Sequence, residues 1–410
     1  MRLLQLIKMP LRPVKKVFLD FRAKYNLSKK KEKVNGKIKV VFICQCQHIW
    51  NKLRYLAKTL SEDSNFEVVL YIVKDPLDDS NGETIFENYA KEHGIKYYFY
   101  EDVKLKDLNP LYVIYPRPYD VWLNEDIRSN VVCSYANTVY IPYGYSLMEL
   151  GKVNLNSSFT RNIKIFFADM GYAYDYFKRQ HKKQIKREIQ FAYNLGHPYL
   201  DELGQIKENC CQEKSAFLSL KNQGLNVIWT PRWTVKDKLG GSNFFRYIDG
   251  MFEEFIDNKE YNFVFRPHPY AFDNYVKEGL MTEGEKEGYL SKINTSKNSV
   301  YDFADDYFAT FLDSNLLITD ISSIIAEYLL TKKPVIFCHN EKNEILNYKM
   351  KEILTVFYNA YSMEDIRSFI EQIKSGNDYL KEEREKFVDK FLQEQIGTAE
   401  RIKNVLKDFC

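Results

Sequence analysis

Short apolar runs alternate with helical stretches along almost the whole chain, and this alternation constrains the fold more than any other feature. Strands that alternate with helices, and that are apolar throughout, are typical of an open parallel sheet covered on both faces. In the first half we expect strands at 38–44, 66–73, 95–100, 111–116, 138–147 and 163–170. The intervening helices are expected at 49–61 and 85–94, and a basic, tyrosine-rich helix is expected at 172–192.

The alternation restarts in the second half, where the clearest unit is DSNLLITDISSIIAEYLLTKKPVIF, residues 313–337. Leu316–Thr319 is a short, buried-type strand, and Ser322 and Ser323 are residues that favour the start of a helix. Lys-Lys-Pro then ends the helix before a second apolar strand. This strand–helix–strand unit predicts a second parallel sheet. Further strands are expected at 226–231, 262–269 and 334–338, and the charged region 363–410 is expected to be helical.

The chain has 410 residues, which is too long for one compact core. We therefore expect an α/β protein with two Rossmann-like domains that face a cleft. The expected parts are residues 1–37, a basic amphipathic segment; 38–205, the first domain; 206–375, the second domain; and 376–410, C-terminal helices that close on the first domain.

The first residues differ sharply in charge from the rest of the chain. Residues 1–39 hold 13 Lys and Arg against 2 Asp and Glu, and leucine, valine and phenylalanine recur among them, at helical spacing from residue 14. Such a segment favours the surface of an anionic membrane, here through residues 1–33. The alternatives are a helix docked on the protein itself and a nucleic-acid-binding arm, but the many leucines speak against nucleic acid. No apolar run is long enough to span a bilayer.

The seven cysteines follow no metal-binding spacing, so a reducing, cytoplasmic compartment fits the chain best. We expect no metal and no cofactor.

Three strands of the second half end in polar residues. Because ligands of open α/β sheets bind at the carboxyl ends of strands, these residues predict an anion site. Arginine forks match phosphate oxygens, and a helix start offers unpaired N–H groups. Taken singly, each residue has an ordinary alternative: a surface ion pair, a packed histidine, or a plain helix cap with a solvated Glu327. The predicted set is Thr230, Arg232, Thr234, Arg266, His268, Asp320, Ser322, Ser323 and Glu327.

The same motifs resemble those of the CDP-glycerol glycerophosphotransferases, the family of the teichoic-acid primases and polymerases. The resemblance rests on Asp320-Ile-Ser-Ser with its carboxylate at 327 and the following Lys-Pro-Val-Ile-Phe, together with GHPYLD at 196–201, WTPRWT and RPHP. It covers about residues 38–400. It implies a GT-B-like fold, a CDP-linked donor on the C-terminal domain, and peripheral attachment to the inner face of the cell membrane.

One position departs from the family. Where the family places a His-Gly pair, thought to hold the base, this chain has Tyr143-Gly144-Tyr145. A tyrosine with its usual pKa near 10 is a poor base at neutral pH, so we expect Tyr143 to face the cleft and position a substrate. The candidates for the missing base are His48, Glu149 and His197. GHPYLD also has Tyr199 where the family has arginine.

The favoured function is transfer of a phospho-alditol, such as glycerol phosphate, from a CDP-linked donor to a glycan or lipid-linked acceptor, with release of CMP. His268, Arg266 and Tyr143 are the expected catalytic residues. An alternative is a GT-B glycosyltransferase that uses a nucleotide sugar for capsule or surface glycan. A third possibility is a membrane-bound scaffold with a vestigial nucleotide site. Nucleic acid is not an expected partner.

Overall fold

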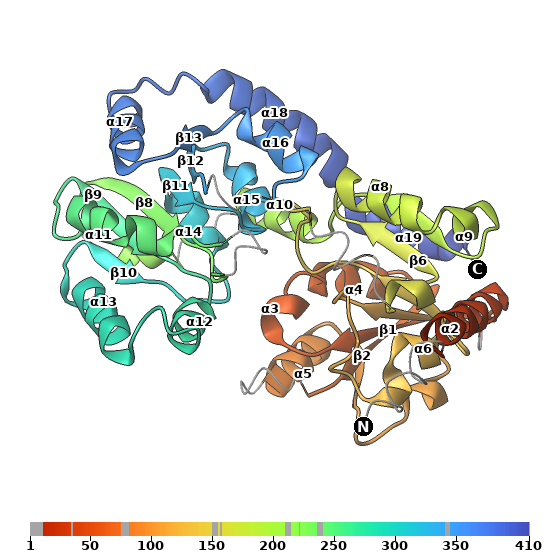
Figure 1. Ribbon diagram of the computed structural model, residues 1–410. Helices are drawn as coiled ribbons and strands as arrows, with labels where there is room; N and C mark the ends of the chain where they lie inside the picture. The colour runs from red at the N-terminus through yellow and green to blue at the C-terminus, as the bar shows by residue number, and fades with distance from the viewer. Residues whose placement is uncertain are drawn as a thin grey trace, which may run out of the picture. The chain divides into compact units, whose positions relative to one another are not determined.

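The computed structural model describes residues 11–33, 36–74, 82–149, 155, 158–209, 215–220, 222–235, 241–340 and 345–409. The chain divides into two compact units. The first unit consists of Met1–Ser146, Leu150–Asp201 and Gly397–Cys410, and the second of Leu147–Glu149 and Glu202–Ile396 (Figure 1). The first ten residues of the predicted membrane segment lie outside the described part of the chain.

The first unit contains a parallel sheet of seven strands in the order β3-β2-β1-β4-β5-β6-β7. Val40 and Phe42 of β1 are buried in one core, and Val41 and Ile43 in another, because helices cover both faces of the sheet. The strands are β1 (Ile38–Cys44), β2 (Phe66–Ile72), β3 (Lys96–Phe99), β4 (Tyr112–Tyr115), β5 (Asn137–Tyr140), β6 (Ile165–Ala168) and β7 (Phe191–Asn194).

The helices of the first unit include one correction to the sequence prediction. Residues 172–192 do not form a single helix: α8 (Gly171–Gln180) and α9 (Lys182–Lys186) end before β7. Phe191 instead pairs beside Ile165 of β6, so a long-range sheet contact overrides the local helical pattern. The other helices are α2 (Leu11–Ser28), α3 (Gln47–Trp50), α4 (Arg54–Ser61), α5 (Gly82–Glu92), α6 (Ser129–Val132) and α19 (Thr398–Asp408), with 3-10 turns η1 (Leu105–Leu108), η2 (Glu125–Ile127) and η3 (Thr160–Asn162).

The C-terminal helix α19 is part of the first unit, where its blue ribbon lies among yellow and orange elements (Figure 1). Ile402 and Leu406 are buried against the sheet, and the Tyr112 hydroxyl donates to the Leu406 carbonyl at 2.9 Å. The Asp201 carboxylate accepts hydrogen bonds from the backbone N–H groups of Gly397 (2.5 Å) and Ala399 (2.7 Å). The aspartate of the GHPYLD turn therefore caps this helix.

The N-terminal helix α2 packs on the first unit with one face and exposes the other. Ala23 and Leu27 are buried, and the Lys164 ammonium donates to the Leu27 carbonyl at 3.0 Å. The outward face is also apolar: its members are exposed by 58 to 69%, and they are Val17, Phe18, Phe21 and Tyr25. None of the described helices is long and apolar enough to cross a membrane.

The second unit contains a parallel sheet of six strands in the order β10-β9-β8-β11-β12-β13. Its core is rich in aromatic side chains, such as Trp229 stacked on Phe244 with 5.9 Å between ring centroids. The sequence missed the short strands β10 and β13. The strands are β8 (Leu225–Thr230), β9 (Tyr261–Phe265), β10 (Ser299–Tyr301), β11 (Leu316–Thr319), β12 (Val335–Cys338) and β13 (Tyr358–Ala360).

Helices flank this second sheet and join its strands (Figure 1). They are α10 (Tyr199–Asn209), which begins in the first unit, α11 (Phe244–Phe255), α12 (Ala271–Lys277), α13 (Glu283–Thr295), α14 (Phe308–Asp313), α15 (Ile324–Tyr328), α16 (Tyr348–Leu354), α17 (Met363–Lys374) and α18 (Lys381–Gln395), with 3-10 turns η5 (Ala216–Ser219) and η7 (Leu329–Thr331).

In each sheet the strand order runs outward in both directions from one central pair of neighbouring strands. β1 lies beside β4 in the first sheet, and β8 lies beside β11 in the second. The helices that follow the two neighbouring strands leave in opposite directions at such a point, so the carboxyl ends of these strands are where a doubly wound sheet binds its ligands. The fold thus predicts a ligand site at the carboxyl edge of each sheet.

Candidate functional site

The second-sheet edge consists of residues 230–234 after β8, 266–270 after β9 and 320–323 after β11. Side chains join the ends of β8 and β11: the Thr230 hydroxyl donates to the Thr319 hydroxyl at 2.8 Å. The Arg232 guanidinium donates to the Ile321 carbonyl at 3.4 Å and is largely buried, which lowers its pKa from the ordinary value. Thr234 is also buried. The structure therefore brings these predicted residues into one connected cluster.

His268 lies at the exposed side of this edge. Its backbone N–H donates to the Pro231 carbonyl at 3.4 Å, so the loop after β9 is fastened to the loop after β8. The ring lies 5.5 Å from the Trp233 ring between centroids. Its Nδ1 accepts from the Tyr270 backbone N–H at 3.2 Å, which leaves Nε2 to carry the proton of the neutral imidazole.

Ser322 and Ser323 precede α15, a helix of five residues that continues into η7. Their carbonyls accept the backbone N–H groups of Ile325 and Ala326, both at 3.3 Å. The Ser323 side chain makes no capping hydrogen bond, and its residue is exposed. An ordinary helix cap would use that hydroxyl on the backbone. Here the Ser323 hydroxyl makes no hydrogen bond to the helix backbone and is exposed.

Asp320 is buried and links the edge to the next helix. Its Oδ2 accepts from the backbone N–H of Asn243 at 3.1 Å, and burial raises its pKa to about 6. Asn243 precedes α11, and its side-chain amide donates to the Cys338 carbonyl at 2.6 Å. The sequence analysis missed Asn243. The signal was present in Gly-Gly-Ser-Asn at 240–243, because a glycine pair before a helix marks a sharp turn, and Gly241 has φ +57°.

Arg266 and Glu327 belong to a second part of the same edge. Arg266 forms an ion pair with Asp302 (Nη1 to Oδ2, 2.9 Å), and its guanidinium lies 4.0 Å from the centroid of the Tyr307 ring. The Tyr307 hydroxyl donates to Glu327 Oε2 at 2.7 Å. Glu327 is buried, so it is not the solvated carboxylate that sequence reasoning allowed as an alternative. Asp302 and Tyr307 are the residues that the sequence analysis missed here.

The first-sheet edge carries the tyrosine motif after β5. Tyr143 is 37% exposed, and its backbone N–H donates to the Pro116 carbonyl at 3.1 Å. Gly144 follows it in a bend, and Tyr145 is buried with its ring 5.1 Å from that of His197. His197 is completely buried. Its Nε2 donates to the Pro142 carbonyl at 2.6 Å, and burial lowers its pKa to about 4. His197 thus anchors the loop that carries Tyr143.

His48 lies on the same edge, after β1. It is exposed, and its Nε2 is 3.6 Å from the Cys46 sulfur, to which the buried Arg117 also donates at 3.4 Å. Arg117 was missed, although it follows a strand in the pattern Pro-Arg, as Arg232 does. Glu149, by contrast, is exposed within the second unit, and its backbone N–H donates to the Ile345 carbonyl at 2.7 Å.

Asp169, at the end of β6, is another residue of the first-sheet edge that the sequence analysis missed. Its buried carboxylate accepts from the Ser146 backbone N–H (2.5 Å) and hydroxyl (3.0 Å), and burial raises its pKa to about 6. It therefore holds the end of the loop that begins at Tyr143. Over the described residues, no three His, Cys, Asp or Glu side chains are grouped in a way that would hold a metal ion.

Two doubly wound units, each with polar residues at the carboxyl edge of a parallel sheet, define a transferase fold of the GT-B type. Comparison with known families agrees and is more specific. The model of the CDP-glycerol:poly(glycerophosphate) glycerophosphotransferase family matches residues 148–407. The chain belongs to this family of transferases, as its sequence motifs predicted.

Solved structures with the same fold come from two groups of enzymes. The wall teichoic acid polymerase TagF, in a variant soaked with CDPG, superposes with a TM-score of 0.57 at 17% identity, covering 99% of this chain and 97% of that one. The UDP-GlcNAc 2-epimerase of Neisseria meningitidis bound to UDP-GlcNAc gives a TM-score of 0.60 at 12% identity, covering 91% and 100%. MnaA of S. aureus with UDP gives 0.58 at 12% identity, covering 90% and 96%. A search of curated proteins found no match.

Proposed function

We propose that this protein transfers a phospho-alditol, glycerol phosphate or a close relative, from a CDP-linked donor to a hydroxyl of a surface glycan or a lipid-linked acceptor. The observation that carries the proposal is the family match, which spans nearly all of the second unit and the whole second-sheet edge. TagF, a polymerase of this fold, was solved with CDPG. In this chain the equivalent ligand would occupy the second-sheet edge.

The reaction needs positioning and charge neutralisation more than covalent chemistry by the protein. The acceptor oxygen attacks the phosphorus that carries the alcohol. A new P–O bond forms, the bond from that phosphorus to the bridging oxygen breaks, and CMP leaves with the electron pair. The acceptor proton goes to a base on the protein. Negative charge grows on the leaving phosphate, so donors and cations must surround it.

Five residues of the second-sheet edge have a proposed part in this step. The hydroxyls of Ser322 and Ser323 donate to the donor diphosphate. The exposed His268 ring donates to the transferring phosphate. Arg232 supplies a fixed positive charge from its buried position. Because Arg266 already pairs with Asp302, we assign it a positioning role that keeps Tyr307 and Glu327 in place for the nucleoside.

For the base we propose His48. It is exposed on the first-sheet edge, and an imidazole exchanges its proton near neutral pH. His197 is buried and acts as a neutral hydrogen-bond donor to the loop, so it is less suited to accept a proton from a substrate. Tyr143 would then position the acceptor or the donor through its exposed ring and hydroxyl, as expected from the sequence.

Product analysis tests the reaction. The purified full chain is incubated separately with CDP-glycerol, CDP-ribitol and common nucleotide sugars, together with a glycan or lipid-linked acceptor. We expect CMP and a new phosphodiester from a CDP-alditol. A nucleoside diphosphate and a new glycosidic bond from a nucleotide sugar would contradict the proposal and support the glycosyltransferase alternative.

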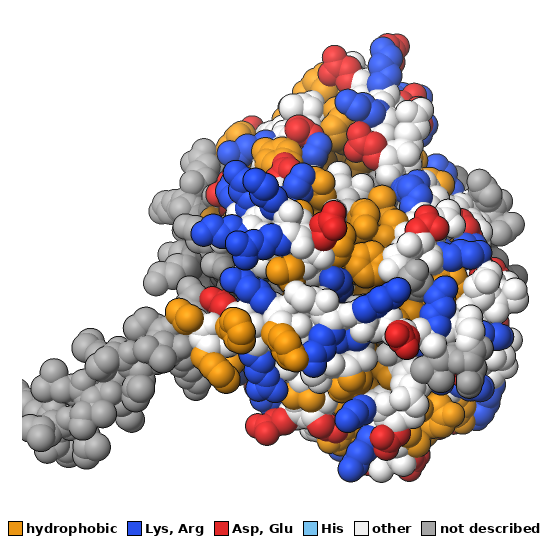
Figure 2. All heavy atoms as spheres, turned by 90° about the vertical axis from the view of Figure 1, so that its right-hand side faces the viewer, with side chains coloured by type: hydrophobic (Ala, Val, Ile, Leu, Met, Phe, Trp, Pro, Cys, Tyr) orange, Lys and Arg blue, Asp and Glu red, His pale blue; other side chains and the backbone are white. Residues whose placement is uncertain are grey.

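We also propose that the protein binds the inner face of the cell membrane through α2. The outward apolar face of that helix (Val17, Phe18, Phe21 and Tyr25) lies near a second, strongly basic surface (Figure 2). Residues 178–187 of α8 and α9 carry six basic and no acidic side chains, and these six are all exposed. Apolar side chains enter the headgroup region while basic side chains attract anionic lipid, so the two surfaces suit one membrane face.

Replacing outward residues tests this attachment better than deleting α2, because deletion would also remove the buried Ala23 and Leu27. A variant with Phe18→Ser and Phe21→Ser should sediment much less with anionic vesicles and keep its transfer activity on a soluble acceptor. The matched control replaces two exposed leucines elsewhere, Leu218→Ser and Leu280→Ser. Equal sedimentation of the α2 variant and the control would contradict the proposal.

A further inference from the structure

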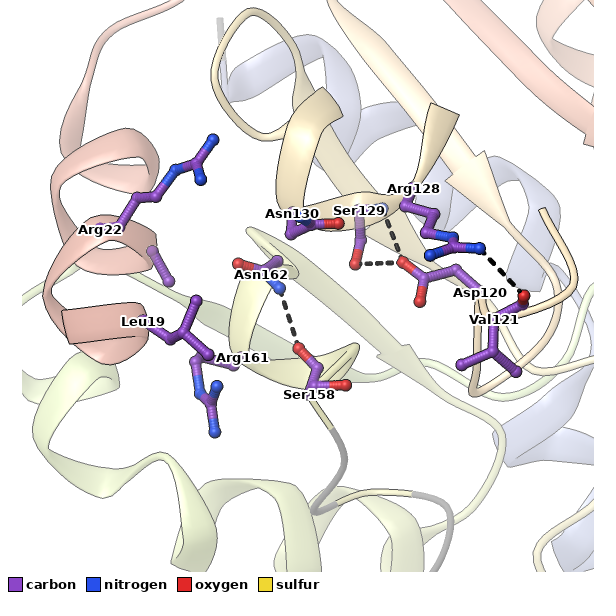
Figure 3. Close-up of a pocket in the computed structure, with 11 residues that line it drawn as sticks. Leu19, Arg22, Asp120, Val121, Arg128, Ser129, Asn130, Ser158, Arg161 and Asn162 are labelled. Carbon is purple, nitrogen blue, oxygen red and sulfur yellow. Dashed lines mark hydrogen bonds between the residues drawn. The ribbon is translucent and has the colours of Figure 1, made fainter. Parts of the chain in front are cut away.

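A pocket of about 230 Å³ lies within the first unit. One wall is α2, which contributes Leu19, Arg22 and Ala23. Arg128, Ser129 and Asn130, at the start of α6, form the opposite wall, and Arg161 from η3 lies at the base (Figure 3). No residue that the sequence singled out for the site lines this pocket.

Three of the residues that line the pocket are arginines, and its single lining carboxylate, Asp120, is already used: Asp120 Oδ2 accepts from the Ser129 backbone N–H at 2.6 Å and from the Ser129 hydroxyl at 2.5 Å. Arg161 pairs with Asp20 at 2.5 Å, and Arg128 lies 3.9 Å from the exposed carboxylate of Glu125. Arg22 is exposed and forms no ion pair with any residue that the structure describes. Arg22 is therefore the cation of this pocket that an anionic ligand would pair with.

Two of the arginines are held in place for such a ligand. Arg128 Nε donates to the Leu123 carbonyl at 2.9 Å, and its Nη2 donates to the Val121 carbonyl at 3.3 Å, the latter drawn in Figure 3. The Asp20 carboxylate fixes Arg161 in the same way from α2. Arginine prefers the paired oxygens of a phosphate, and a guanidinium that is already oriented loses little freedom on binding.

The position of the pocket indicates where the phosphate comes from. Arg22 directly follows Phe21 of the outward apolar face, so one wall of the pocket belongs to the helix that we propose to lie at the membrane. We infer that this pocket binds the phosphodiester of an anionic phospholipid headgroup. The inference rests on the proposed membrane attachment and adds a specific lipid contact to it.

The experiment compares two variants of the full chain that each remove one positive charge from α2. Arg22→Gln removes the unpaired guanidinium of the pocket, and Lys24→Gln removes a charge from the same helix outside it. Sedimentation is measured with phosphatidylcholine vesicles that contain either phosphatidylglycerol or, at equal surface charge, the carboxylate amphiphile cholesteryl hemisuccinate. Release of CMP from CDP-glycerol is measured in parallel and should stay unchanged in both variants.

Lys24→Gln should weaken binding to both vesicles about fivefold, the effect of one surface charge. Arg22→Gln should weaken binding to phosphatidylglycerol about twentyfold, because a charged hydrogen bond is lost as well, and to hemisuccinate only about fivefold. Equal effects of the two variants on phosphatidylglycerol would overturn the inference. A competition experiment gives a second test. If inorganic phosphate displaced the wild type from these vesicles as effectively as soluble glycerophosphoglycerol, the pocket would be a site for free phosphate and the inference would be overturned.

If the wild type binds no vesicles at all, the membrane attachment itself is wrong, and calorimetry then decides about the pocket. Heat from glycerophosphoglycerol that disappears in Arg22→Gln supports a phosphodiester site. The absence of heat with the wild type overturns it.

Discussion

At the scale of single residues, the two sheet edges differ in how their polar groups are used. On the first-sheet edge, His197, Asp169 and Ser146 are engaged in fixing one loop, whereas Tyr143 and His48 are exposed. On the second-sheet edge, His268 and Ser323 are exposed, whereas Asp320 and Glu327 are buried behind them. The exposed residues are the ones we expect to contact substrates, and the buried ones should act through them.

His268→Ala should therefore reduce turnover without unfolding the protein. The ring is exposed, so little packing is lost, but one donor to the transferring phosphate disappears. We expect kcat to fall about 100-fold, with a small change in the KM for CDP-glycerol. Steady-state kinetics measure both values. His93→Ala, at the end of α5, serves as a control, and a His268 variant as active as this control would exclude His268 from the mechanism.

Stability should depend on pH through His197. Its pKa is about 4 in the folded protein and about 6.5 when unfolded, so the unfolded chain takes up a proton first as the pH falls. The contribution of His197 is fully present above pH 6.5 and is lost between pH 6.5 and 4. Between pH 7 and 5 we expect His197 alone to contribute a loss of about 2 kcal/mol to the free energy of unfolding.

Urea unfolding of the wild type and of His197→Gln at the two pH values measures this loss. His181, whose pKa is also lowered to about 4, adds to the loss, whereas Asp169 and Asp320, whose pKa values are raised to about 6, oppose it, so the difference between the wild type and the variant isolates His197. An unchanged dependence in the variant would show that His197 is not the titrating group.

The sequence predicted several candidate site residues but not the residues that contact them, and the reason is sequence distance. Ser322 and Ser323 were predicted because a strand, two serines and a helix follow each other directly. Arg117 reaches Cys46 across 71 residues, and Tyr307 reaches Glu327 across 20. No local pattern records such contacts, so only the fold reveals them.

At the scale of elements, α15 has an unusual start. Its N-cap residue has helical backbone angles and no side-chain cap, and the helix runs for only five residues before η7. A helix so short adds little dipole of its own. The proposed contact to the diphosphate therefore depends on the serine hydroxyls themselves.

Replacing both serines by alanine separates these contributions. The variant Ser322→Ala with Ser323→Ala should weaken CDP binding by about 3 to 6 kcal/mol, the loss of two hydrogen bonds to a charged group. Thermal stability without ligand should hardly change, because the Ser323 side chain does not cap the helix. Isothermal calorimetry measures the affinity, and an affinity equal to that of the wild type would contradict the assignment.

Long elements were predictable from the sequence, and short ones were not. The strands of seven residues, β1 and β2, fall where apolar runs predicted them, and α17, α18 and α19 lie within 363–410, the region predicted to be helical. β10 and β13 have three residues each, which is too few for a period to appear. β7 lies at the end of a run of residues predicted to be helical, and it forms a strand because it pairs with β6.

At the scale of the whole molecule, the chain forms two units, each with its own sheet and its own core. Units with separate cores can unfold in separate steps. If the donor occupies only the second-sheet edge, its binding energy stabilises only the unit that contains this edge.

Differential scanning calorimetry of the full chain should then show two transitions, of which CDP raises one. At a concentration about 100 times the dissociation constant, the stabilisation is about 2.7 kcal/mol, a shift of several degrees. The Ser322→Ala, Ser323→Ala variant should lose this shift and keep both transitions. A CDP-dependent shift of both transitions, or of neither, would contradict binding to the second unit alone.

The return of α19 to the first unit has a consequence for synthesis on the ribosome. Residues 38–201 emerge first, yet Ile402 and Leu406, which complete one of their cores, and the N–H groups that satisfy the Asp201 carboxylate emerge only after all of residues 202–396. During translation the first unit must wait with part of one apolar sheet face uncovered, and with the Asp201 carboxylate lacking these N–H partners, while the second unit is made. The helix that completes the first unit therefore leaves the exit tunnel only after the whole second unit.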